Sequence, residues 1–423
     1  MKVFWTLEPF ERRNLLILFT SGLVFWTGLA SLLPILPLYL KHLGATDWEV
    51  GLVMGAFAIG LLLFRPKLGQ MADRRGRKIV LLLGTIVAAI APLGYLFGSS
   101  IPLLIAVRAF HGICIAAFTT AYSALVVDLS PLRQRGEIIG YMSLVTPIGV
   151  AVGPAIGALI QTGTSYQRSF VFACVLAIIS LLGISYIKEI KQPENQQQTE
   201  SLLVKLTQSS MQPFWQILAR PSLLIPSLVL LLFGFAFGAL TTFVPLYITE
   251  ANVNLNPGWF YTAAAFASFS FRMFIGRASD RYGRGIFITA SIFFYCLSML
   301  MLSNATSANI FLLAGVLEGG GSGTFFPMMI ALISDRSSAQ ERGRIFAICI
   351  SGFDLGVAIA APVFGSLAEY ITYRGIFVLS TGMAFLALII FITLCNKNFS
   401  TSLKFALGKE KDLYSLTKGH VAT

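Results

Sequence analysis

The chain has 423 residues, of which 56% are hydrophobic and only 12% are charged, and its mean hydropathy is +0.77. This composition cannot form the wet surface of a soluble domain, so the sequence predicts an integral membrane protein. The formal net charge of +12 does not indicate nucleic-acid binding, because the basic residues lie in alternate short loops and not on one soluble face. We therefore expect a lipid bilayer, and no nucleic acid, as the macromolecular surroundings.

The apolar runs predict transmembrane helices. A bilayer core of about 30 Å needs roughly 20 apolar residues per helix, and most of the runs have that length, which excludes an outer-membrane barrel. We expect an all-α fold with twelve spans that begin near residues 15, 48, 79, 101, 138, 169, 222, 256, 286, 308, 345 and 374.

The basic residues predict the orientation in the membrane. Of the 31 lysines and arginines, only Lys41, Arg168 and Arg374 lie in the loops that follow odd-numbered spans. By the positive-inside rule, both termini are expected in the cytoplasm. The first apolar run lacks a small-residue cleavage site, so it is predicted to be a retained helix. We expect a bacterial inner (plasma) membrane protein that is a monomer.

The longest polar stretch divides the chain into two parts of similar size. We predict an N-terminal six-helix half over 1–187, a cytoplasmic linker over 188–220, a C-terminal six-helix half over 221–395 and a cytoplasmic tail over 396–423. The tail is expected to be solvated or loosely associated with the membrane. Arg65 and Arg272, near the cytoplasmic ends of their spans, are expected to extend to the membrane surface in a structural role.

A short charged turn occurs twice, 207 residues apart. Both copies lie between apolar runs, and this constant offset predicts an internal repeat of one structural unit. The same offset aligns Asp128 with Asp335, Arg135 with Arg342, and His111 with Glu318. The predicted gate motif comprises Gly69, Asp73, Arg74, Gly76 and Arg77 in the first copy and Gly276, Asp280, Arg281, Gly283 and Arg284 in the second.

The predicted twelve spans, in two groups of six, resemble the major facilitator superfamily. The motif Gly-x-x-x-Asp-Arg-x-Gly-Arg-Lys after span 2 and its second, similar copy after span 8 carry this resemblance. The resemblance covers nearly the whole chain. It implies two pseudo-symmetric six-helix halves that rock about a substrate path near the midplane. It also implies that the turn residues act as conformational switches and not as substrate ligands.

The chemistry of the first turn agrees with that role. Its two glycines permit a sharp reversal, and Asp73 and Arg77 are four residues apart and able to pair. Asp73 can also face a helix N-terminus or Arg135, in contacts expected only while the cytoplasmic side is closed. We predict Arg135 and Arg342 as gate partners. The alternative is that the basic residues of the turn only fix topology.

Two motifs within spans also match the family. Arg108-Ala-Phe-His111-Gly in span 4 resembles an Arg-x-x-x-Gly motif associated with proton coupling, and a guanidinium inside the membrane needs a cavity or a polar partner. Gly149, Gly153, Pro154 and Gly157 in span 5 resemble a motif typical of antiporters, with Ala158 as a departure. The alternatives are a structural hydrogen-bonding arginine and an ordinary helix-packing seam.

Proton coupling requires a group near the midplane that gains and loses a proton. Glu318 in span 10 and Asp354 in span 11 are the candidate carboxylates, and Arg108 and His111 complete the predicted coupling or substrate cavity. Burial should favour the neutral carboxyl unless a cation offsets it. The alternative for each is a static group that holds helices together.

No P-loop, His-x-x-x-His pair or nucleophile elbow occurs, so we expect neither an enzyme nor ATP drive, and no cofactor or metal. The sequence favours a secondary transporter that exchanges protons for a small amphipathic or apolar compound and exports it. Uptake or exchange of a polar metabolite, such as a sugar or an organic anion, is the alternative, with Arg108 as the anion partner. A non-transporting sensor on the same fold is the third reading.

Overall fold

The computed structural model describes residues 7–131, 134–161, 165–188, 214–338 and 341–416, and it is helical without a strand in these ranges. The side chains of 214–215, 273–277, 280–281 and 342–343 are outside the description. The helices of the first half are α2 (Pro9–Ser31), α3 (Ile35–His42), α4 (Asp47–Arg75), α5 (Arg77–Phe97), α6 (Ile101–Asp128), α7 (Arg135–Met142), α8 (Val145–Ile160) and α9 (Gln167–Ser185).

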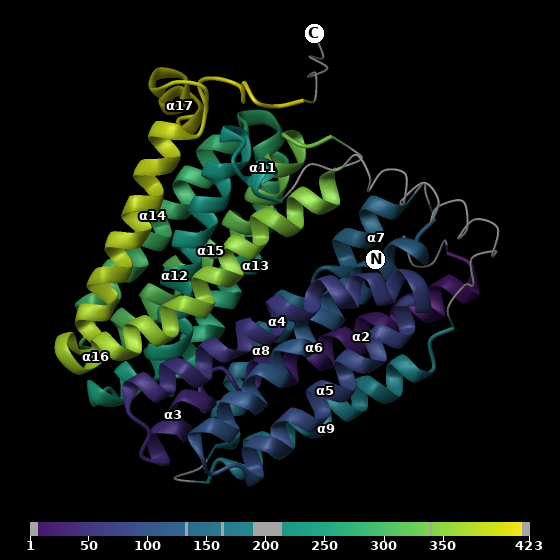
Figure 1. Cartoon of the computed structure of the whole chain (residues 1–423), viewed down its shortest axis with the longest axis vertical. Helices are drawn as coiled ribbons and strands as arrows, with labels where there is room; N and C mark the ends of the chain where they lie inside the picture. The colour runs from purple at the N-terminus through teal and green to yellow at the C-terminus, as the bar shows by residue number, and fades with distance from the viewer. Residues whose placement is uncertain (1–6, 132–133, 162–164, 189–213, 339–340, 417–423) are drawn as a thin grey trace.

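The second half repeats this arrangement. Its helices are α11 (Phe214–Leu218), α12 (Pro221–Glu250), α13 (Gly258–Tyr282), α14 (Arg284–Ser303), α15 (Ala308–Asp335), α16 (Arg342–Leu394) and α17 (Phe399–Ala406). Figure 1 shows the two halves as separate bundles, purple to blue and teal to yellow, that lie against each other.

The predicted twelve spans are present. Ten segments of the described chain are long and apolar enough to cross a membrane. Helix α13 adds a further 25 residues, and α16, at 53 residues, is two helices merged across the non-helical Thr372. Counting α16 as two spans and adding α13 gives twelve.

The bundle has two ends, which we call the terminal side and the far side. The terminal side carries the start of α2, the turns at Gly76 and Gly283, and α17, which packs against the start of α14. The far side carries the connections over 43–46, 98–100 and 251–257. In Figure 1, α3 and the bend of α16 lie close together at the far side.

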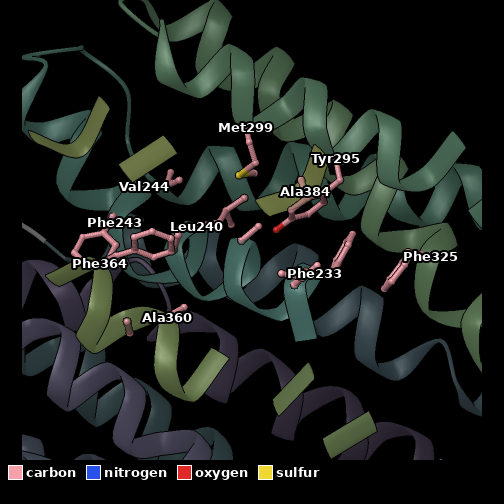
Figure 2. Close-up of a cluster of buried hydrophobic side chains, with 14 of the residues drawn as sticks. Phe233, Leu240, Phe243, Val244, Tyr295, Met299, Phe325, Ala360, Phe364 and Ala384 are labelled. Atoms are coloured by element: carbon pink, nitrogen blue, oxygen red, sulfur yellow. The ribbon is translucent and has the colours of Figure 1, made fainter. Parts of the chain in front are cut away.

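The apolar core is divided between the halves but joined at the far side. One cluster of buried side chains lies wholly within the first half. The other fills the second half, and Figure 2 shows part of it around Phe233, Phe243 and Tyr295. This second cluster also takes in Leu36 and Val50 from the first half, so the two bundles share a core where they meet.

The described part of the tail is exposed at many positions, as expected for a solvated tail, but it also binds the second half through buried residues such as Phe405. The Arg336 side chain is 0% exposed and pairs with Asp412 at 2.7 Å. Arg336 also donates to the carbonyl oxygens of Ser222 and Cys395, and the Leu416 amide donates to the carbonyl oxygen of Asp335. A buried guanidinium needs such polar partners. The sequence alone did not indicate that the tail supplies one of them, Asp412.

Candidate functional site

The first charged turn has the sharp reversal that its glycines predict. Helix α4 ends at Arg75, Gly76 has φ 102°, and α5 begins at Arg77. The Arg77 Nε atom lies 2.9 Å from the Asp128 carboxylate, and its guanidinium is 3.9 Å from Asp73. The main partner of Arg77 is therefore Asp128, at the end of α6, because the contact with Asp73 is long and Asp73 is 76% exposed.

The second turn reproduces this geometry. Gly283 has φ 86°, and the Arg284 Nε atom lies 3.5 Å from the Asp335 carboxylate. Both ion pairs occur at positions 207 residues apart, so the repeat extends from the sequence to the contacts. The side chains of Gly276, Asp280, Arg281 and Arg342 are outside the described residues. Asp128 and Asp335 were found by the sequence repeat but were not recognised as partners of the turns.

Asp73 and Arg135 do not form the predicted gate contact in this conformation. Among the described residues, no hydrogen bond or ion pair joins them, Arg74 is exposed, and the buried Nε atom of Arg135 has no hydrogen-bond partner. The contact was expected only with the cytoplasmic side closed, so Arg135 stays a predicted gate partner.

The predicted residues of span 4 form one buried cluster inside the first half. Arg108 is 7% exposed, and its guanidinium lies 4.3 Å from the centre of the Phe57 ring on α4. His111 is 1% exposed, and its Nδ1 atom is hydrogen-bonded to the Tyr95 hydroxyl of α5 at 2.9 Å. The Nε atom of Arg108 has no hydrogen-bond partner. Tyr95 was not predicted, because nothing in the sequence distinguishes it from other tyrosines.

Glu318 occupies the equivalent place inside the second half. It is 5% exposed, its side chain is hydrogen-bonded to Ser322, and it lies within electrostatic reach of Tyr261 and Tyr295. The Tyr295 hydroxyl is buried without a hydrogen-bond partner, and Figure 2 shows it among apolar side chains. Each bundle therefore encloses ionisable side chains on its fourth span, Arg108 and His111 in the first half and Glu318 in the second, near a tyrosine from the third span.

The same close helix packing surrounds both clusters. A Cβ atom on Gly112 would overlap the Phe57 carbonyl oxygen, and one on Gly319 would overlap that of Ala264. These two contacts are again related by the 207-residue offset. Within the described chain, no hydrogen bond, ion pair or ring contact joins the His111 cluster to Glu318, so each cluster belongs to its own bundle.

Asp354 and Arg65 form an ion pair across the two halves. The Arg65 Nη1 atom lies 2.6 Å from the Asp354 carboxylate, and the side chains are 27% and 12% exposed. Arg65 was expected to extend to the membrane surface in a structural role, and the structure adds a carboxylate partner that the sequence did not indicate. Of the two candidate carboxylates, Glu318 and Asp354, only Asp354 therefore forms an ion pair among the described residues. Arg272, the repeat partner of Arg65, donates instead to the Gly323 carbonyl oxygen at 2.9 Å.

The antiporter-type motif lies where α8 passes between the two halves. A Cβ atom on Gly153 or Gly157 would overlap backbone oxygens of Thr27 or Ser31 on α2, as the packing prediction requires. On its other side, α8 faces α13 of the second half. Thr262 donates to the Ala151 carbonyl oxygen at 3.0 Å.

The two halves touch chiefly at the far side. The Asn256 side chain donates to the Ala158 carbonyl oxygen at 3.0 Å, and the Tyr373 hydroxyl donates to Asp47 at 2.6 Å. Both contacts lie at the far-side ends of their helices, whereas Asp73 at the terminal side is exposed. This conformation is therefore closed at the far side.

Two related six-helix bundles, each with a buried ionisable cluster and a charged turn at one end, define the class of secondary membrane transporters. The family model of the Major Facilitator Superfamily matches residues 18–258 and 255–411. The chain belongs to this superfamily.

Curated relatives of the chain are efflux proteins. It is 25% identical over 366 residues to the staphylopine export protein of Staphylococcus aureus, covering 86% of this chain and 91% of that protein. It is 27% identical over 249 residues to the quinolone resistance protein NorA of Staphylococcus aureus, covering 58% of this chain and 61% of that protein. The chain is an integral membrane protein of a transporter family.

Solved transporters share the fold. The nucleoside transporter NupG superimposes with a TM-score of 0.75 at 14% identity, over 89% of this chain and 98% of that one. The inward-open xylose transporter XylE from E. coli gives a TM-score of 0.70 at 16% identity, over 89% and 94% of the two chains. At this identity the likeness concerns the fold alone.

Proposed function

We propose that the protein exports a small amphipathic or apolar compound in exchange for protons, with its terminal side facing the cytoplasm. The observation that carries this proposal is the environment of Glu318. It is a buried carboxyl whose neighbours are hydroxyl groups, and within the described chain no ion pair joins it to a base. An ionised carboxylate is costly in such an interior, so proton binding and release there are linked to exposure of the site.

Asp354 serves as the internal contrast to Glu318. It is paired with Arg65 across the halves, whereas within the described chain no ion pair joins Glu318 to a base. We propose that the ion pair of Asp354 affects the equilibrium between conformations and that Glu318 binds and releases the exchanged proton. Export is supported by the efflux proteins among the relatives, and the quinolone and staphylopine in the names of those proteins suggest the first compounds to test.

An organic anion is the second candidate substrate class. It is favoured by Arg108, a buried guanidinium whose Nε atom has no hydrogen-bond partner in this conformation. Anion binding would supply that partner.

The test uses sealed vesicles that contain the protein, an imposed pH gradient and a pH-sensitive dye. Quinolones, staphylopine, lipophilic cations, sugars and organic anions are added in turn to wild type, Glu318→Gln and Glu369→Gln. Glu369 is an exposed carboxylate of α16, so its variant is the matched control. We expect one class to collapse the gradient in wild type and in Glu369→Gln but not in Glu318→Gln. Compound equilibration without proton movement would contradict the proposal.

A further inference from the structure

One of the polar contacts between the halves at the far side connects α4 with α16. The Asp47 carboxylate, at the start of α4, accepts the Tyr373 hydroxyl of α16 at 2.6 Å. The same carboxylate oxygen lies 3.1 Å from Lys41 Nζ. Tyr373 is 8% exposed, so this hydrogen bond is largely shielded from water.

Backbone contacts flank this hydrogen bond. A Cβ atom on Gly365 would overlap the Asp47 carbonyl oxygen, and one on Gly51 would overlap that of Ala361. Helices α4 and α16 therefore touch through glycines over the far-side part of their length.

Thr372, next to Tyr373, has a backbone conformation that only glycine adopts readily. Its φ of 61° and ψ of 169° interrupt α16 and set the direction in which Tyr373 leaves the helix. For a β-branched residue this conformation is strained, and such outliers persist where the surrounding structure holds them. The strain lies at the one break in α16, directly beside the contact that joins the halves.

A cavity of about 550 Å³ adjoins this contact. Both halves line it, with Lys41, His42 and Asp47 from the first and Glu250 and Tyr373 from the second. The hydrogen bond between Asp47 and Tyr373 therefore lies in the wall of a cavity at the far side.

We propose that Asp47 and Tyr373 form the latch of the far-side gate and that Thr372 is its hinge. Breaking the hydrogen bond lets α4 and the second part of α16 separate, and the halves then part at the far side. The inference rests on membership of the transporter family and on the contact itself, and it does not depend on proton coupling at Glu318.

The test measures the separation of the far-side ends without a substrate. Spin labels at Ser99→Cys and Asn254→Cys mark exposed far-side connections of the first and second halves. Distance distributions are compared in the labelled protein with Tyr373→Phe, Asp47→Asn and Tyr370→Phe. Tyr370 is 83% exposed and three residues from Tyr373, so its variant is the matched control.

We expect Tyr373→Phe to raise the ratio of separated to closed far-side ends about tenfold, the effect of losing one hydrogen bond to a charged group. Asp47→Asn keeps a neutral acceptor oxygen and should raise the ratio by a smaller factor. Tyr370→Phe should leave the distribution unchanged. Since Tyr373→Phe removes only one oxygen atom, the fold should persist, and size-exclusion elution checks it. Unchanged distances in both latch variants, or an equal change in the control, would overturn the proposal.

Discussion

The ion pair between Arg65 and Asp354 gives the sharpest energetic prediction. Its atoms are 2.6 Å apart, and the side chains are 27% and 12% exposed. An exposed pair contributes about 0–1 kcal/mol, and breaking a fully buried one costs about 3–5 kcal/mol. The partial exposure places this pair between these limits. We expect Asp354→Asn to destabilise the folded protein by about 2 kcal/mol, because it leaves the guanidinium without its carboxylate.

A double-mutant cycle isolates the pair. Asp354→Asn, Arg65→Gln and the double variant are unfolded in mixed SDS micelles, and a thiol-reactive dye reports exposure of the cysteines. Burial raises the pKa of the Cys395 thiol to about 11, so it labels slowly until the fold opens. We expect a coupling energy of about 2 kcal/mol. A coupling below about 0.5 kcal/mol would refute the reasoning, since the pair would then contribute no more than a solvated surface pair.

Two further predictions concern packing and the tail. Gly112→Ala should reduce the yield of folded protein, because the new methyl group overlaps the Phe57 carbonyl oxygen. In Gly382→Ala the new methyl group meets nothing within 4 Å, so this control should be neutral. The yield of monodisperse protein in detergent solution measures both effects. Asp412→Asn should destabilise the fold by roughly 3 kcal/mol, because Arg336 is fully buried beside it. If the midpoint of SDS-induced unfolding is unchanged in Asp412→Asn, the pairing of the tail with Arg336 does not stabilise the fold.

The sequence predicted the features that repeat or that depend on composition. Apolar length predicted the twelve spans, and the 207-residue offset predicted two related halves. The offset also aligned Asp128 with Asp335, which the structure shows as partners of Arg77 and Arg284. Those patterns are local or periodic, so one chain suffices to detect them.

Contacts between distant segments could not be predicted in this way. Arg65 and Asp354 are 289 residues apart, and Asp47 and Tyr373 are 326 apart. The repeat offers no help there, because Arg272 binds a backbone oxygen where Arg65 binds a carboxylate. The tail shows the same limit, since only the folded chain places Asp412 beside Arg336.

The central claim, that Glu318 carries the exchanged proton, is tested most directly by proton release on compound binding. Purified protein in weakly buffered detergent solution receives the compound that collapses the pH gradient most strongly, and a pH indicator follows released protons. We expect wild type and Glu369→Gln to release protons in proportion to bound compound, and Glu318→Gln to bind the compound without release. Equal release from Glu318→Gln and wild type would contradict the claim and would assign the proton to another group.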